Sequence, residues 1–221
     1  MLIQGQIGQA VGADGTNNNL RQSRTSELIV SQNHARYYET ASRGNIFNLT
    51  LSAAVGGVVA GNLVGAAANA ATQFAIWNPM GSGFNMAIMK TTIAIYSGTI
   101  VAGPVFHGVF SLGNPTNQTT FDAGRGAQNS MIGGRQPVVR YINTATTGTT
   151  ITGGTTPLTH KPMNMQFSAG TYAALAGSSG ITDLVDGDIV IPPGYGWLPL
   201  WTGGGTSVVY SASCTWEEVP I

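Results

Sequence analysis

The last part of the chain alternates strictly between inward and outward side chains, and this pattern restricts the fold more than any other feature. Within residues 207–219, one set is Val208, Tyr210, Ala212, Cys214 and Trp216, and the interleaved set is Ser211, Ser213, Thr215 and Glu217. Successive side chains of a β-strand point to opposite faces, so the segment predicts a long strand with one face in a core. We therefore interpret Cys214, the one cysteine, as a small core residue and not as a nucleophile.

Other strand-like segments recur between glycine and proline turns, with Phe47, Leu49 and Leu51 showing the same alternation. We predict strands at 27–31, 47–51, 73–77, 84–97, 105–112, 137–142, 188–191 and 197–201, and weaker ones at 163–167 and 171–175. Residues 113–135 read as a long loop and 144–156 as a surface hairpin. Many strands, uneven loops, no convincing amphipathic helix and no internal repeat predict an all-β fold. We expect a jelly-roll or Greek-key β-sandwich with an extended N-terminal arm.

Residues 1–44 differ from the rest, and we assign them to an arm that precedes a β-sandwich at 45–221. They include too few large apolar residues for a core of their own, yet they hold four of the seven arginines. Arginine and tyrosine are typical of interfaces. We predict that the arm contacts a neighbouring subunit through Arg21, Arg24, Glu27, Arg36, Tyr37, Tyr38 and Arg43. The alternative is a first strand of the same domain at 27–31, and both descriptions can hold together.

Charged residues make up only 8% of the chain, against roughly 25% in an ordinary soluble domain. The formal net charge is zero, so copies of the chain experience little mutual repulsion. A surface this poor in charge favours a protein that is covered by partners in a large assembly. A secreted protein with a surface rich in Thr, Asn and Gly is the alternative.

The same composition argues against several partners. The two lysines, Lys90 and Lys161, and the neutral balance do not provide the clustered cations that bind nucleic acid directly. The first residues show no basic stretch followed by an apolar run, so we expect no signal peptide. Residues 53–71 are rich in Ala and Gly and include asparagines, a composition too weakly apolar for a membrane-spanning helix.

No set of residues shows the spacing of a catalytic or metal site. The histidines His34, His107 and His160 are far apart, and we interpret each as a hydrogen-bonded or packing residue. Asp183, Asp186 and Asp188 suit either a calcium loop or Asx turns, and turn chemistry explains them as well as a cation does.

The adjacent acids Glu217 and Glu218 face opposite sides of a strand, which is wrong for a glycosidase pair. A hydrolase acting on cell-wall sugar is therefore the least favoured reading. We expect no enzyme activity, no cofactor and no metal.

The C-terminal aromatic residues have two interpretations. Tyr195, Trp197, Trp201 and Tyr210 could stack on sugar rings as exposed platforms, or they could pack between two sheets. Trp197 and Trp201 share one strand face, and this favours the core. The stretch from Gly187 to Gly194 resembles the turn of cupin-type jelly rolls, but it lacks the metal-binding histidine, so the resemblance concerns a strand and turn alone.

Several stretches of the chain form a recognisable pattern: Gly15-Thr16, the run from Leu20 to Val30, the run from His34 to Glu39, Arg43-Gly44-Asn45, Asn78 to Gly83, and Trp216 to Pro220. In these stretches the chain, and above all its arm, resembles virion structural proteins from tailed bacteriophages, which share such an N-terminal segment. The match is close over the first 45 residues and only general beyond them. The resemblance implies a component of a phage particle with a shared arm and a variable β-domain.

We therefore expect a non-enzymatic virion protein that assembles in the host cytoplasm. The favoured role is a homotrimeric head-decoration or capsid-reinforcing protein that contacts the major capsid protein or other virion proteins. The alternative role is a receptor-binding or fibre-tip module that recognises host surface glycans through loops 113–135 and 144–156.

Overall fold

The chain divides into two compact units, residues 1–39 and 40–221. The computed structural model describes residues 5–6, 20–21, 36–51, 59–60, 71–72, 74–100, 102–112, 123–124, 127–143, 149–150, 158–167, 170–172, 179–201 and 205–221. In the first unit, β1 (Gly5–Gln6) and β2 (Leu20–Arg21) form a parallel pair. The strand predicted at 27–31 lies outside the described residues.

The second unit is built from β-strands. The longer ones are β3 (Ile46–Leu51), β6 (Phe74–Trp77), β7 (Phe84–Ile100), β8 (Gly103–Ser111), β11 (Arg140–Asn143), β13 (Leu158–Phe167), β15 (Ser179–Ile191), β16 (Tyr195–Trp201) and β17 (Gly205–Pro220). The short ones are β4 (Val59–Ala60), β5 (Ala71–Thr72), β9 (Ala123–Gly124), β10 (Gln128–Asn129), β12 (Thr149–Thr150) and β14 (Gly170–Tyr172). The all-β prediction is confirmed.

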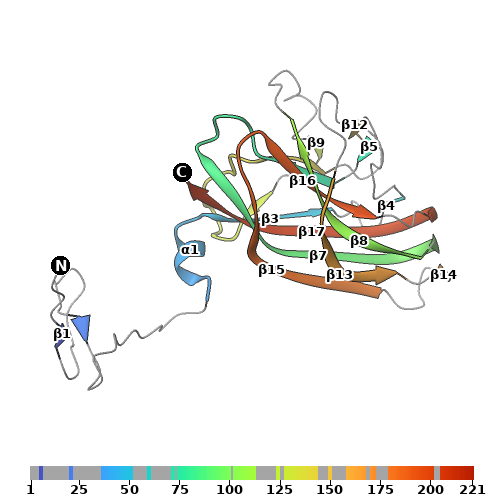
Figure 1. Cartoon of the computed structure of the whole chain (residues 1–221), viewed down its shortest axis with the longest axis horizontal. Helices are drawn as coiled ribbons and strands as arrows, with labels where there is room; N and C mark the ends of the chain where they lie inside the picture. Colours follow the sequence, from blue (N-terminus) through green and yellow to red (C-terminus); the bar gives the residue numbers. More distant parts are fainter. Residues whose placement is uncertain are drawn as a thin grey trace. The chain divides into compact units, whose positions relative to one another are not determined.

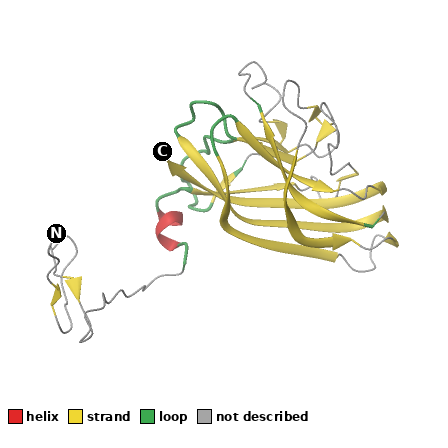
Figure 2. Ribbon diagram, viewed as in Figure 1, coloured by secondary structure: helices red, strands yellow, loops and turns green. Residues whose placement is uncertain are grey.

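Most of these strands belong to two sheets that form the layers of a sandwich (Figures 1 and 2). Sheet one has the order β10-β3-β17-β7, and both β14 and β15 pair with the far edge of β7. Sheet two has the order β13-β8-β16-β6-β11-β9. The pairs are antiparallel except between β9 and β11. The chain crosses repeatedly from one sheet to the other, and β8 pairs with β13 within sheet two.

The main core lies between the two sheets and contains large side chains from both. Trp216 of sheet one stacks on Phe47 at a ring distance of 5.8 Å, and Trp197 of sheet two meets Phe74 edge to face at 6.2 Å. Cys214 is fully buried in the same cluster, and burial raises the pKa of its thiol. The interpretations of Cys214 and Trp197 as core residues are therefore confirmed.

Sheet two is also buried on its other face. A second apolar cluster there contains Trp77, Phe110, Leu198 and Leu200, so every residue of β6 is buried. Strands buried on both faces lose the in-and-out alternation of side chains. This explains why residues 74–77 read as a continuous apolar run.

Several strand boundaries differ from the prediction. β11 begins at residue 140 and not at 137, because the N–H groups of Val138 and Val139 donate to a side chain instead of a neighbouring strand. β15 begins at residue 179, well before the predicted start at 188. The turn-like residues Asp186 and Gly187, both with positive φ, form a bulge within this strand and do not end it.

The helix α1 (Tyr38–Ser42) is absent from the sequence-based prediction. It is a short helix that ends at Ser42 and is capped by Gly44, which has a φ of 70°. Gly44 donates to the carbonyl of Ala41 and Asn45 to that of Thr40, the paired closing bonds of a Schellman motif. Residues 40–44 belong to the second unit, which therefore begins before the predicted end of the arm at residue 44.

Candidate interaction surface

The residues predicted to form the arm interface are only partly described. Arg24 and Glu27 lie outside the described residues, and Arg21 is described as part of β2. Arg36, Tyr37, Tyr38 and Arg43 are exposed. The structure brings Arg36 and Tyr37 together, with the guanidinium carbon 5.2 Å from the ring centroid.

At one end of the sandwich the backbone is held together by a dense set of hydrogen bonds. This end, which we call the proximal end, comprises residues 40–45, 78–84, 129–139, 192–195 and 218–221. Asn78 is central to one part of it: its side chain donates to the carbonyls of Phe84 and Ile191, over 2.8 and 3.0 Å. The C-terminal Ile221 donates to Gly83, which joins the end of β17 to the turn before β7.

The side chain of Asn129 organises the loop 129–139. It accepts a bond from the N–H of Met131 over 2.8 Å, and it donates to the carbonyls of Gly44 and Arg135, each over 2.9 Å. Side chains of Asn commonly replace backbone partners in turns in this way. One side chain therefore connects the start and the middle of the loop to the segment that follows α1.

Glu218 fixes the second half of the loop, although its side chain is fully buried. One carboxylate oxygen accepts from the N–H groups of Val138 and Val139 over 2.8 and 3.0 Å. The other accepts from Arg135 over 2.6 Å. Charge-assisted hydrogen bonds of this kind are the strong ones in proteins. The carboxylate is thus satisfied by two backbone groups and one cation.

Arg135 is held on its flat faces as well. Its guanidinium carbon lies 4.9 Å from the ring centroid of Phe47 and 5.1 Å from that of Phe84, and it donates to Asn45. Sequence reasoning correctly placed Glu217 and Glu218 on opposite faces but missed this network. The strand alternation contained a signal for it: Glu218 is two residues after Trp216 and so points into the core, and a buried acid needs a partner.

The exposed tip of this well-anchored loop is apolar. Ile132 is 98% exposed and Met131 is half exposed. Gly134 donates back to Met131 over 2.9 Å, and Gly133 has a φ of 80°, which defines a type II turn with Ile132 at its first central position. We call Met131 and Ile132 the tip.

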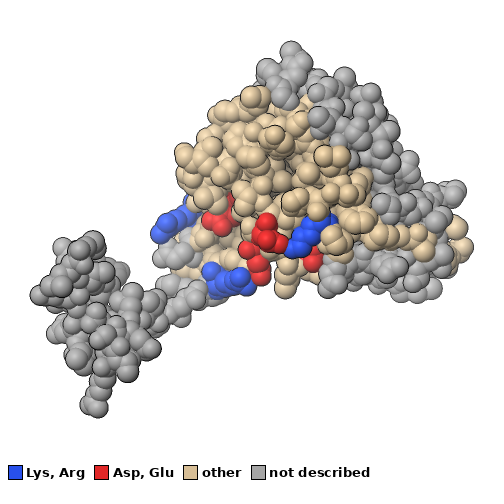
Figure 3. Space-filling view, in the orientation of Figure 1, with Lys and Arg blue, Asp and Glu red and all other residues tan. Residues whose placement is uncertain are grey.

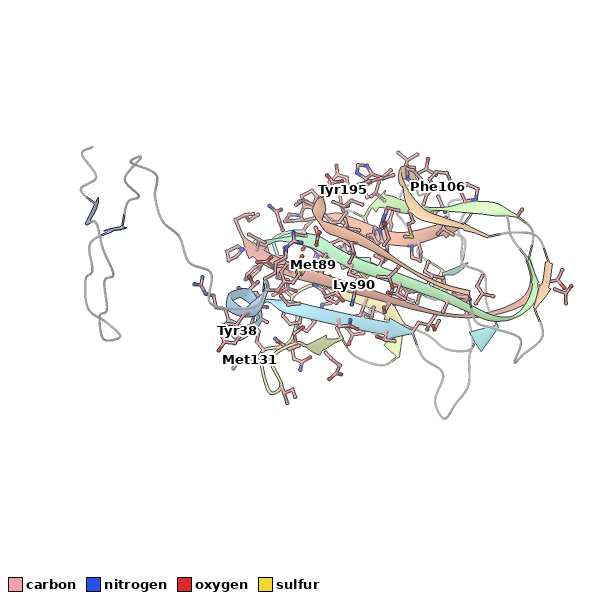
Figure 4. All side chains as sticks on the ribbon, turned by 90° about the horizontal axis from the view of Figure 1, so that it is seen from below. Tyr38, Met89, Lys90, Phe106, Met131 and Tyr195 are labelled. Carbon is pink, nitrogen blue, oxygen red and sulfur yellow. The ribbon has the colours of Figure 1, made fainter. Side chains whose placement is uncertain are left out.

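A second apolar group lies around the turn 78–83. Met80 is 64% and Ile221 is 73% exposed, and Tyr195 is half exposed. Tyr195 accepts from the N–H of Asn78, and a Cβ on Gly194 would lie 3.1 Å from the side chain of Met80. We call Met80, Tyr195 and Ile221 the turn patch. Figure 4 shows Tyr195 and Met131 at opposite edges of the sandwich.

Charged groups of the described residues are few and mostly lie together. On the face seen in Figure 3 they lie along the lower edge, and the described residues in the upper part of that face include no charged side chain. Lys161 and Asp188 form an exposed ion pair, which raises the pKa of the lysine and lowers that of the aspartate. The carboxylate of Asp188 is thus paired with a lysine, which weighs against its use as a ligand in the calcium loop that the sequence allows.

Asp183 also has a basic partner of its own. Its Oδ2 lies 2.8 Å from Nε2 of His107, and Nδ1 of His107 lies 3.1 Å from Nε1 of Trp197. An indole N–H is only a donor, so Nδ1 accepts and Nε2 carries the proton that is donated to Asp183. His107 is thus a buried, hydrogen-bonded residue, as its interpretation required. Both ring nitrogens are occupied, so this His–Asp pair cannot act as a general base in this state.

No protein-family model, curated protein or solved structure matches this chain. Among the described residues, no helix has the length and apolar character needed to cross a membrane. The function must therefore be inferred from the fold and from the geometry of the proximal end.

Proposed function

We propose that this chain is a non-enzymatic structural protein of a tailed-bacteriophage virion. In this role it is a homotrimeric head-decoration or capsid-reinforcing protein that contacts the major capsid protein. The resemblance of the arm to virion proteins suggests that the chain is part of a phage particle. The strand order of the sandwich is the structural observation that carries the proposal.

We infer that the sandwich is a jelly roll. Setting aside the four-residue strand β11, which lies between β6 and the edge strand β9, we number the eight other longer strands along the chain. Sheet one then holds the first, eighth, third and sixth of them in spatial order, and sheet two holds the fifth, fourth, seventh and second. This order is what two interlocked Greek keys produce, and such jelly rolls are frequent in viral capsid proteins. Fold alone does not define function, so the order supports the proposal by analogy.

The surface chemistry agrees with a covered protein. Charge is scarce over the whole chain, and the exposed apolar residues of the proximal end are of the kind that interfaces bury. The side edges of the sandwich have the opposite character. β13 carries Lys161 and Pro162 with irregular pairing, and β15 carries the bulge at Asp186. A lysine, a proline and a bulge on edge strands disfavour edge-to-edge pairing of sheets. We therefore expect assembly through the proximal end and the arm.

The test removes the arm while leaving the β-domain complete. Because residues 40–44 are held by the domain, the deletion should cover residues 1–39. We expect this variant to fold, with a far-UV circular dichroism spectrum typical of β-structure, and to be absent from purified particles. Incorporation equal to that of the full chain would refute the role of the arm.

Recognition of host glycans is the second candidate, because jelly rolls also occur in lectins and Tyr195 is exposed. Trp197 and Tyr210 are buried, so these two aromatics are not available for stacking on sugars. A glycan array with the full chain separates the candidates. Reproducible binding at micromolar concentration that is lost in Tyr195→Ala would favour the second one.

A further inference from the structure

His107 is fully buried between the two sheets, and its ring links three strands. From β8, Nε2 donates to Oδ2 of Asp183 on β15 over 2.8 Å. Nδ1 accepts from Nε1 of Trp197 on β16 over 3.1 Å. The first bond crosses from sheet two to sheet one, and the second ties the ring to a neighbouring strand of its own sheet (Figure 1). A neutral imidazole has one donor and one acceptor, so both are in use.

A proton on Nδ1 reverses the role of that atom. In the imidazolium form both ring nitrogens carry hydrogen, and neither can accept a hydrogen bond. The bond to Asp183 persists and becomes charge-assisted, which is the stronger kind. The indole of Trp197 can only donate, so its N–H then faces the new N–H of His107. These two donors must move apart, and the buried indole N–H loses its acceptor.

The indole of Trp197 cannot move without disturbing the main core. It is buried among apolar residues, and it meets Phe74 edge to face at a ring distance of 6.2 Å. The ring of His107 lies 6.0 Å away on another side. Protein interiors are close-packed, so a large side chain leaves its position only when its neighbours repack. Loss of one hydrogen bond is therefore transmitted to the layer between the sheets.

Ionisable groups surround His107 on the strands packed against it. They are Asp183 on β15, His160 and Lys161 on β13, and Cys214 on β17, which shares the inward row of Asp183. Burial lowers the pKa of His107 most, Lys161 and His160 lower it further, and Asp183 raises it. Burial raises the pKa of the Cys214 thiol, so that group stays neutral. Asp183 is thus the carboxylate that compensates a charge on His107.

We infer that His107 and Trp197 form an acid-sensitive switch inside the sandwich. In neutral solution His107 ties β8 to both β15 and β16, and in mild acid it keeps Asp183 and releases the indole of Trp197. The proton comes from solvent at the edge of the sandwich, where the side chain of Asp183 is 15% exposed. The midpoint lies below pH 6.5, because burial lowers the pKa of His107. The switch acts within one chain and does not depend on the proposed virion role.

The experiment follows the indole N–H and imidazole signals of the full-length chain by NMR between about pH 7.5 and 5. We expect the Trp197 signal to move with the same midpoint as the ring of His107. The signal of Trp77, which donates to the carbonyl of Leu112, should stay in place. In His107→Gln the amide offers one donor and one acceptor but does not titrate, so the Trp197 signal should also stay.

Two results of this titration would overturn the inference. One is a Trp197 signal that stays fixed while His107 titrates. The other is a His107 ring that remains neutral until the chain unfolds. Circular dichroism over the same range establishes where the fold is intact.

A pair of matched variants tests the link from the other side. Trp197→Phe keeps an aromatic ring but removes the donor that favours neutral His107. The pKa of His107 should therefore rise by at least about half a unit, a threefold gain in proton affinity. Trp77→Phe makes the same change at another buried tryptophan, whose partner is a backbone carbonyl, and should leave the pKa unchanged. Equal pKa values of His107 in the two folded variants would also overturn the switch.

Discussion

At the scale of single residues, the buried polar groups of the sandwich differ in whether they have a hydrogen-bond partner. Most have partners: the Trp77 indole donates to Leu112, and the Asn143 amide donates to Thr50. Among the described residues, Oδ1 of Asn78, Oγ1 of Thr91 and Nε1 of Trp216 are buried without a hydrogen-bond partner. A buried polar atom without a partner costs free energy, so these positions are where a substitution can stabilise the protein.

We predict that Thr91→Val stabilises the fold. Valine has nearly the same shape as threonine, and it removes the unpaired hydroxyl from a site that is 1% exposed. The free energy of unfolding in urea should rise by about 1 kcal/mol. Thr92→Val is the matched control, because the neighbouring Thr92 hydroxyl lies on the outer face and bonds to Thr182. A gain no greater than that of the control would contradict the prediction.

At the scale of elements, the loop 129–139 depends on a residue from the end of β17. This dependence joins segments far apart in the chain, since Glu218 holds Arg135, Val138 and Val139 together. A buried carboxylate is tolerable only when it is fully paired, as it is here.

We therefore predict that Glu218→Gln lowers the free energy of unfolding by about 2–4 kcal/mol. The amide retains the size of the side chain, but it leaves Arg135 without its counter-charge and replaces one acceptor with a donor. Glu217→Gln is the control on the same strand. Glu217 is only partly buried and its burial raises its pKa, so neutralising it should cost little. Equal losses in the two variants, measured by urea unfolding, would show that the network is unimportant.

At the scale of the whole molecule, His107 joins the two sheets. It lies on β8 of sheet two and bonds to Asp183 on β15 of sheet one, while Trp197 supports it from β16. Burial lowers the pKa of His107 below 6.5, against the raising effect of Asp183. The charged and titratable groups that act on it are Asp183, and Lys161 and His160 on β13.

The lowered pKa has a defined consequence for stability. Below pH 6.5 the unfolded chain binds a proton at His107 that the folded chain resists, so the free energy of unfolding falls as the pH falls. Between pH 7.5 and 5.5 this loss is at most about 1.4 kcal/mol, because pH 5.5 lies one unit below the pKa of histidine in the unfolded chain. The loss should disappear in His107→Gln and remain in His160→Gln, whose histidine is exposed. Equal pH dependence of urea unfolding in His107→Gln and the unchanged protein would contradict this.

The in-and-out pattern was sufficient to predict the elements that have one buried and one open face. Residues 46–51 and 205–220 are examples, because alternation is a local property that each strand carries in its own sequence. It failed for residues 179–187 of β15, where Asp186 and Gly187 resemble a turn, and for α1, which is too short to show a helical period.

The sequence by itself determined that this chain forms β-strands around an apolar core, which residues of β17 face inward, and that the chain carries no formal net charge. Only the tertiary structure decided the partner of Glu218, the bridge from His107 to Asp183, and the place of the tip. The reason is that these depend on contacts between residues separated by 76–83 positions, or on backbone shaped by such contacts. Strand periodicity specifies which way a side chain points and not what it meets.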